Sequence, residues 1–258
     1  MKKILYFIAI IFCCIQLTNC GNDESGSNET TNPGGDPSTG NPNDGKGGSL
    51  AVFALKGNYL YTVDYKTLHV FQIADPANPI KVNDVQIGFD IETLYSLDNY
   101  LFMGAQSGMY IYDITNPENP TKMSEARHFT ACDPVVANQT HAFVTLHSNT
   151  ACGGSINSLN VYDIADIKNP LLVHQRNLVS PKGLALYNDY LIICDDELKI
   201  FDISNPVQPT LLKAFNKQYT DVVIYNNILF AFGPNQISQY KWQNNDFTTL
   251  EQISSLSY

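Results

Sequence analysis

A nine-residue phrase occurs four times along the chain and constrains its fold more than any other feature. The copies read Phe71-Gln-Ile-Ala-Asp-Pro-Ala-Asn-Pro79, Tyr112-Asp-Ile-Thr-Asn-Pro-Glu-Asn-Pro120, Tyr162-Asp-Ile-Ala-Asp-Ile-Lys-Asn-Pro170 and Phe201-Asp-Ile-Ser-Asn-Pro-Val-Gln-Pro209. Their final prolines are 41, 50 and 39 residues apart. Self-similarity with a period of about 40 residues is typical of proteins built from stacked or radially arranged repeats.

Each repeat contains short apolar runs in the same order. In the fourth unit they are Leu184–Asn188, which ends in a polar turn, Tyr190–Ile192, Leu198–Phe201 and Leu211–Phe215. The runs are rich in β-branched and aromatic residues, and no stretch shows a sustained helical period. Four strands in each of five units predict an all-β fold, a five-bladed β-propeller over residues 49–258. The blades are expected near residues 50–88, 91–129, 132–180, 183–219 and 221–258.

The prolines of the phrase indicate a turn between the third and fourth strands of each unit. Proline fixes φ and cannot donate to a central ladder, and it pushes the residue before it toward extended conformations. The fifth unit has lost the phrase, since Lys241-Trp-Gln-Asn-Asn-Asp-Phe247 occupies its place. Terminal repeats are commonly atypical, because they close or cap the array.

The phrase and the strand before it resemble the LVIVD repeat. In the fourth unit this part reads Leu198-Lys-Ile-Phe-Asp-Ile203, and the resemblance covers residues 50–258. It is strong in units two and four, good in units one and three, and weak in unit five. Unit one departs from the pattern, because Gln72 stands where the other copies have Asp. The resemblance implies a β-propeller in a secreted or surface protein, often a bacterial lipoprotein. It implies no common catalytic residues, so no site is carried over from it.

The N-terminus has the features of a targeting segment. Lys2 and Lys3 precede a 12-residue apolar stretch, Ile4–Ile15, which is too short to span a bilayer comfortably. Cys20 then stands before polar sequence and resembles the lipidated cysteine of a bacterial lipoprotein box, although Asn19 departs from the small residue usual there. We therefore expect residues 1–20 to be a signal peptide and Cys20 to carry a lipid. A plain secretory signal with an incidental cysteine stays an alternative.

Residues 21–48 have the composition of a flexible tether. They contain no aromatic or large aliphatic residue, so they cannot bury enough apolar surface to offset the entropy of ordering. Asp23 and Glu24 directly after Cys20 resemble the acidic signal that directs some Gram-negative lipoproteins to the cell surface. Polar linkers often contain acids, so this resemblance has a neutral alternative. The expected location is the outer membrane of a Gram-negative bacterium, facing the exterior.

The charge of the chain makes nucleic acid an unsuitable partner. The whole sequence has a formal net charge of −10, and removal of residues 1–20 takes away two lysines and no acid, which leaves −12. Such a surface repels both nucleic acid and anionic lipid. The membrane is therefore expected as a partner only through the anchor at Cys20.

The third unit is longer than the others by about ten residues, which lie in the segment 147–158. Cys132 and Cys152 are placed in loops that a blade brings to one face, and we expect a disulfide between them in an oxidising compartment. His128, Asp133 and His147 lie in the same loops, but they show no metal-ligand spacing, so no metal and no cofactor are expected. Cys194 is expected to be a buried small apolar residue.

Most functional candidates fall in loops at the same face, where the loops of several blades converge. The candidate binding residues are Asp64, Tyr65, Asp133, His147, Asp195, Asp196 and Asp221. An acidic funnel with tyrosines is suited to a cation, a sugar or a basic peptide, whereas the competing interpretation is that these loops are simply well solvated.

Three classes of function stay open from the sequence. The first is a surface-anchored binding or scaffold module for protein or glycan, which the repeats, the tether and the lack of a catalytic motif favour. The second is a glycoside hydrolase or lyase that uses funnel carboxylates, which must stand at a defined separation. The third is a structural subunit of a larger envelope assembly. An enzymatic activity is the less favoured expectation.

Overall fold

The computed structural model describes residues 48–88, 90–128, 134–148 and 154–258, all of which belong to one compact unit. These residues form five antiparallel sheets of four strands each. The first two sheets contain β1 (Phe53–Lys56), β2 (Tyr59–Asp64), β3 (Thr67–Gln72) and β4 (Ile80–Gln86), then β5 (Ile91–Leu97), β6 (Tyr100–Ala105), β7 (Gly108–Asp113) and β8 (Thr121–Arg127). The third contains β9 (Val135–Ala137), β10 (His141–Leu146), β11 (Ser158–Asp163) and β12 (Leu171–Asn177).

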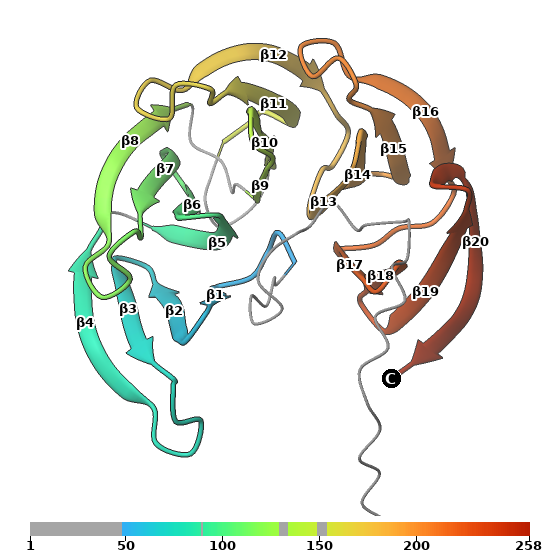
Figure 1. Cartoon of the computed structure of the whole chain (residues 1–258). Coiled ribbons are helices and arrows are strands. Elements are labelled where there is room, and N and C mark those ends of the chain that lie inside the picture. Colours follow the sequence, from blue (N-terminus) through green and yellow to red (C-terminus); the bar gives the residue numbers. More distant parts are fainter. Residues whose placement is uncertain (1–47, 89, 129–133, 149–153) are drawn as a thin grey trace, which may run out of the picture. The chain divides into compact units, whose positions relative to one another are not determined.

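The last two sheets repeat this order. The fourth contains β13 (Leu184–Tyr187), β14 (Tyr190–Cys194), β15 (Leu198–Asp202) and β16 (Thr210–Phe215), and the fifth contains β17 (Asp221–Tyr225), β18 (Ile228–Gly233), β19 (Gln236–Gln243) and β20 (Asp246–Ser257). Each sheet lies within one predicted blade, and its strands follow in sequence order. Figure 1 shows the first strand of each sheet innermost and the fourth at the rim. The predicted five-bladed propeller is confirmed. No helix occurs among the described residues, so none there has the length and hydropathy to span a bilayer.

The turn between third and fourth strands is built by the side chains of the repeated phrase. In the first sheet, Asp75 accepts hydrogen bonds from the backbone N–H of Ala77 (3.0 Å) and from the side-chain amide of Asn78 (2.7 Å). Asp166 and Asn169 repeat the side-chain bond in the third sheet at 2.7 Å. The fifth sheet instead turns through Asn244 and Asn245, both at positive φ, as a two-residue hairpin loop of type I′ requires. A tight hairpin thus replaces the lost phrase.

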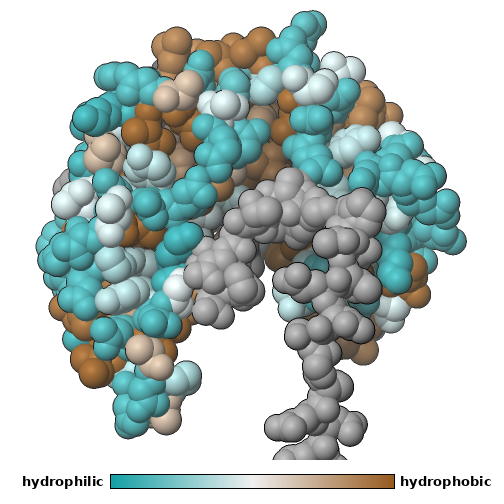
Figure 2. Space-filling model, in the orientation of Figure 1, coloured by the Kyte–Doolittle hydropathy of each residue, from teal (hydrophilic) through white to brown (hydrophobic). Residues whose placement is uncertain are grey.

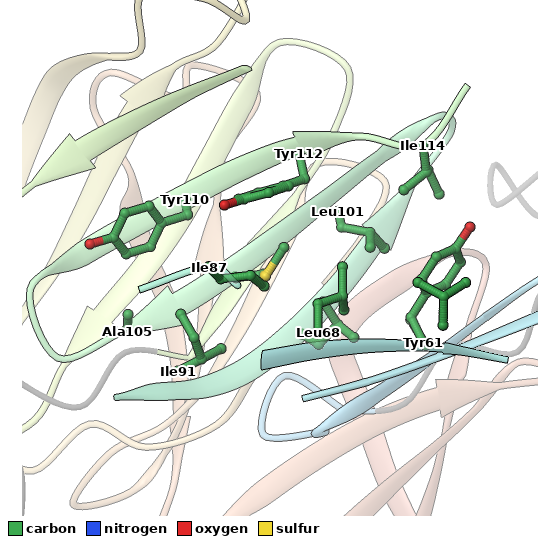
Figure 3. Packing of buried hydrophobic residues seen from close by; sticks show 13 residues of the cluster. Tyr61, Leu68, Ile87, Ile91, Leu101, Ala105, Tyr110, Tyr112 and Ile114 are labelled. Carbon is green, nitrogen blue, oxygen red and sulfur yellow. The ribbon is translucent and has the colours of Figure 1, made fainter. Parts of the chain in front are cut away.

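The core is a series of layers between consecutive sheets. Figure 3 shows the first layer, in which Tyr61 and Leu68 of the first sheet meet Leu101 and Tyr112 of the second. Three further layers join the second to the third, the third to the fourth and the fourth to the fifth sheet. Met103, Tyr110 and Cys194 lie in these layers, and the expected burial of Cys194 is confirmed. Burial of such apolar area is what holds one blade against the next, at roughly 25 cal/mol for each Å² removed from water.

Candidate functional site

The structure brings four of the predicted site residues to one end of three consecutive sheets. His147 directly follows β10, Asp195 and Asp196 join β14 to β15, and Asp221 begins β17. Lys182 lies between them, because its backbone N–H donates to the carbonyl of Cys194 (2.7 Å) and its carbonyl accepts from the hydroxyl of Thr145 (2.7 Å). Burial, together with the nearby charge of Lys182, lowers the pKa of His147.

Asp195 is an internal anchor at this end. Its side chain is fully buried, and it accepts hydrogen bonds from the backbone N–H groups of Ser180 (2.5 Å) and Val179 (3.0 Å) and from the ammonium of Lys199 (2.7 Å). Burial opposes its charged form, but Lys199 and the two N–H groups outweigh burial and hold its pKa below the ordinary value. Asp196 contacts the same ammonium at 2.6 Å. The carboxylate of Asp195 therefore fixes the loop before β13 to the β14–β15 hairpin.

Asp221 has the opposite electrostatics. Its carboxylate accepts from the hydroxyl of Ser49 (3.1 Å) and from the backbone N–H of Val222 (2.9 Å), and no ammonium or guanidinium among the described residues pairs with it. Burial raises its pKa to about 6. The backbones of Gly48 and Gly183 lie close to this carboxylate. A Cβ atom at Gly48 would be 2.1 Å from one carboxylate oxygen of Asp221, and a Cβ atom at Gly183 would be 2.0 Å from the other. Glycine at both positions is what allows this contact.

Asp64 and Tyr65 belong to a separate network on the first sheet. The Asp64 carboxylate bonds Nε2 of His69 (2.9 Å), whose Nδ1 contacts Asp84 (2.6 Å), and Lys81 pairs with Asp84 (2.7 Å). The Tyr65 side chain is 74% exposed. No described contact joins these residues to His147, Asp195 or Asp221. Asp133, Cys132, Cys152 and Cys20 lie outside the described residues.

A central cavity of about 230 Å³ is the feature that the sequence did not predict. It runs along the innermost strands of the second to fifth sheets. At one end it reaches Gly48 and Ser49, and at the other it reaches the turns between first and second strands. Its polar lining includes Ser49, Tyr95, Asn138, Gln139, Tyr187 and Asn188, and its apolar lining includes Leu97, Leu186, Val223 and Ile224. None of the described residues that line it is an acid, a base or a cysteine.

The polar groups of the cavity are positioned by the hairpin turns. Asn138 accepts from the backbone N–H groups of Thr140 (3.0 Å) and His141 (2.8 Å), and Gln139 donates to Asp98 of the neighbouring turn (2.8 Å). The hydroxyl of Tyr187 donates to Asn245 at 3.2 Å. The polar turns are visible in the sequence, but their convergence on one cavity depends on how the blades are placed. Among the described residues no group of three or more His, Cys, Asp or Glu side chains is arranged to hold a metal ion.

Together, the five radially ordered sheets and the axial cavity define a β-propeller. Comparison with known families then shows its repeat: the LVIVD repeat matches residues 47–86, 96–127 and 180–217. Three of the five units of this β-propeller thus match the LVIVD repeat, and the resemblance found in the sequence is confirmed. The matches fall in units one, two and four, whereas the extended third unit and the divergent fifth unit lie outside them.

Solved structures with the same fold are distant in sequence. A functionally unknown protein from Desulfotomaculum acetoxidans aligns with a TM-score of 0.63 at 11% identity, over 78% of this chain and 66% of its own. A periplasmic gluconolactonase of Pseudomonas aeruginosa aligns with a TM-score of 0.61 at 12% identity, over 78% and 68%. A protein from Lactobacillus plantarum gives 0.61 at 13% identity, over 77% and 67%. The chain thus spans about two thirds of these structures, and the likeness shows the fold alone. No curated protein matches the sequence.

Proposed function

We propose that the chain is a lipid-anchored binding protein of the outer membrane surface, whose propeller holds an uncharged polar ligand in its central cavity. The ligand is a glycan end or an uncharged part of a protein. The observation that carries the proposal is the chemistry of the cavity lining. Amide and phenol groups beside aliphatic side chains suit hydroxyl-rich ligands, because they offer both donors and acceptors without a charge to neutralise.

The size of the cavity sets the scale of this ligand. About 230 Å³ is smaller than the roughly 300–1,000 Å³ of pockets that hold drug-sized molecules. The proposed occupant is therefore a single sugar unit or the tip of a longer chain, with the remainder outside the propeller.

The same lining counts against the alternative of a carbohydrate-active enzyme. Hydrolysis of a glycosidic bond requires two carboxyl groups around the bond, and the described part of the cavity lining contributes none. The carboxylates near the Ser49 end of the cavity are already engaged: Asp195 is held by Lys199 and two backbone N–H groups, and Asp221 by Ser49 and backbone. The relative from Pseudomonas aeruginosa is a gluconolactonase by its name, but its likeness to this chain extends only to the fold.

The anchoring part of the proposal rests on the sequence. Residues 1–20 act as the signal peptide, Cys20 carries the lipid, residues 21–48 form the tether, and residues 49–258 form the propeller. Asp23 and Glu24 support an exterior orientation.

A glycan array probed with the purified chain tests the binding function. We expect retention of a defined glycan without product formation. Gln139→Ala should weaken retention about tenfold, because it removes an exposed amide from the cavity mouth. Gln208→Ala is the matched control, since Gln208 is also an exposed turn glutamine and is not among the residues of the cavity lining. Product formation would instead support the enzyme, and equal loss in both variants would argue against the cavity as the site.

A further inference from the structure

At the first three junctions between blades, the repeated phrase of one blade lies over the blade before it. The phrase of the second blade, residues 112–120, supplies two acceptors to the first sheet. The hydroxyl of Tyr59 donates to the Glu118 carboxylate (3.0 Å), and the hydroxyl of Tyr61 donates to the carbonyl of Pro117 (2.9 Å). The phrase therefore covers part of this junction as well as turning its own blade.

The next two junctions repeat this contact. Ser124 of the second sheet donates to the carbonyl of Ile167 (2.6 Å), and Arg176 of the third sheet donates to the carbonyl of Pro209 (2.9 Å). Ile167 and Pro209 belong to the phrases of the third and fourth blades. A junction whose following blade has no phrase is thus expected to lack this cover.

The junction between the fourth and fifth blades is that case. Seven residues, 114–120, join β7 to β8 in the second sheet, whereas only Asn244 and Asn245 join β19 to β20 in the fifth. Tyr190 begins β14 as Tyr59 begins β2, but its hydroxyl has no hydrogen-bond partner within the described part of the chain. The loss of the phrase thus leaves a phenol without the carboxylate that its counterpart contacts.

A pocket of about 620 Å³ lies at this uncovered place, and we call it the side pocket. It is lined by Asn188, Asp189, Tyr190, Asp202, Ser204 and Asn245. Asn188, Asp189, Ser204 and Asn245 are exposed, so the pocket is open to water. Hydrophilic side chains also predominate on the visible surface of the fifth sheet, at the right of Figure 2. The amide, hydroxyl and carboxylate groups of the lining suit a polar occupant.

The side pocket offers strong hydrogen-bond acceptors. Asp202 accepts from the backbone N–H of Ser204 (2.8 Å), and the carboxylate of Asp189 has no partner among the residues described. Burial, followed by the charges of Asp246 and Asp202, raises the pKa of Tyr190, so its hydroxyl stays protonated and able to donate. A carboxylate accepts from a hydroxyl group in a stronger hydrogen bond than a neutral oxygen does.

One wall of the side pocket is an aromatic ring with a firm support. Tyr190 packs against Phe247 with ring centroids 5.4 Å apart, and Phe247 stacks on Trp242 at 4.2 Å. The ring of Tyr190 thus places an apolar surface beside the donors and acceptors of the lining. A sugar unit matches both, because its ring carries hydroxyl groups and an apolar C–H face.

The side pocket adjoins the central cavity. Asn188 lines both of them, and Tyr187 of the cavity donates to Asn245 of the side pocket at 3.2 Å. A chain molecule that leaves the cavity at the turns between first and second strands therefore passes Asn188 and enters the side pocket.

We propose that the central cavity and the side pocket together bind a neutral oligosaccharide, with its terminal sugar unit in the cavity and the adjacent unit in the side pocket. The inference rests on the proposed function and names its ligand class, a chain of at least two neutral sugar units. The uncharged lining of the cavity suits a neutral terminal unit. Asp189 and Asp202 disfavour an acidic unit beside it, because like charges repel each other.

An array of neutral gluco-, manno- and galacto-oligosaccharides of one, two and three units tests the length of the ligand. It is probed with the detergent-solubilised full chain over a wide range of protein concentration. For the series that the protein recognises, the half-saturating concentration should fall about tenfold or more from one unit to two. The second unit causes this step, because it gains hydrogen bonds to charged acceptors in the side pocket.

Two variants of the side pocket assign the step to its residues. Asp189→Asn and Tyr190→Phe should each raise the half-saturating concentration for the two-unit glycan about tenfold, toward that of the single unit. Gln139→Ala, in the cavity, should weaken the binding of single units as well. The matched controls are Glu251→Gln and Tyr225→Phe, which change the same chemical groups at exposed positions outside both pockets and should leave binding unchanged.

A two-unit glycan whose second unit is a uronic acid tests the charge of the side pocket. It should bind about fivefold more weakly than the neutral glycan, because its carboxylate meets those of the pocket. Asp189→Asn should reduce this difference. A purely structural role of Asp189 would instead weaken the binding of both glycans alike and overturn the proposal.

The other outcomes separate this inference from the proposed function. Equal affinity for one, two and three units would overturn the side pocket and leave glycan binding in the cavity standing. A preference for two units that neither side-pocket variant reduces would overturn the side pocket as well. Retention of no neutral glycan would overturn both the side pocket and the glycan ligand of the proposed function.

Discussion

The hydroxyl of Ser49 donates to the carboxylate of Asp221 across 3.1 Å, although the two residues are 172 positions apart in the chain. The Ser49 oxygen also accepts from the backbone N–H of Leu184 at 2.7 Å. One serine before the first strand is thereby bound to the fourth and fifth sheets at one end of the central cavity, of which it is a lining residue. The contact ties the start of the propeller to its last two blades.

Asp221→Asn should stabilise the propeller at neutral and higher pH. The folded pKa of Asp221 is about 6 against an ordinary value of 3.8, so the folded state binds a proton that the unfolded state has released between these values. Stability therefore falls as pH rises from about 4 to about 6, by at most about 3 kcal/mol. Asparagine keeps an oxygen acceptor and carries no charge, so we expect a gain of about 1 to 3 kcal/mol near pH 8 and none near pH 4. Urea unfolding of the parent and of Asp221→Asn between pH 4 and pH 8 measures this gain. If both proteins show the same dependence of the unfolding free energy on pH, the prediction is wrong.

Asp195→Asn should have the opposite effect. The pKa of Asp195 is held below its ordinary value, so its stabilisation is present above about pH 4 and is lost as pH falls further. The substitution leaves Lys199 with only the more exposed Asp196, and breaking a buried pair commonly costs several kcal/mol. We expect a loss of about 2 to 4 kcal/mol at pH 7 in urea unfolding.

The control for this prediction is Asp196→Asn, whose side chain is 41% exposed and which contacts the same ammonium. Exposed ion pairs contribute little, so its effect should stay within about 1 kcal/mol. Equal losses in the two variants would show that Asp195 is not the buried anchor.

The blades could be predicted from the sequence because their determinants are local. The repeated phrase builds a turn with its own side chains, as Asp75 and Asn78 do, and the alternating apolar runs set the strands. Even the fifth blade, which lacks the phrase, was located by its apolar runs, although its turn through Asn244 and Asn245 was not foreseen.

The candidate site could be predicted only in part. The order of strands indicated that the loops with His147, Asp195 and Asp221 share one end of the sheets, and the structure places them so. The order of strands could not indicate that Lys199 and backbone N–H groups bind Asp195, or that Ser49 contacts Asp221, because these contacts depend on how the blades are placed. For the same reason, the convergence of Tyr95, Asn138 and Tyr187 on one cavity has no sequence signal.

Cys20→Ser should release the chain from the membrane fraction of its native host. The prediction follows from the proposed lipid anchor, since one cysteine supplies the only site of attachment. Fractionation and labelling with a palmitate analogue measure it, and Cys194→Ser is the control, because that thiol is fully buried in the propeller. A Cys20→Ser variant that stays membrane-bound and labelled would refute the anchor.

Tyr187→Ala and Tyr225→Ala should differ sharply in their effect on stability, although both remove a tyrosine from the same position of consecutive blades. Tyr187 packs edge-on against Trp242 (centroids 4.9 Å apart), contacts Phe247 (5.1 Å) and bonds Asn245. Its removal should cost about 3 to 5 kcal/mol in urea unfolding.

The Tyr225→Ala variant should lose no more than about 0.5 kcal/mol of stability in the same measurement, because Tyr225 is 66% exposed. A large loss in the Tyr225→Ala variant would contradict the prediction, because it would mean that another part of the protein covers Tyr225.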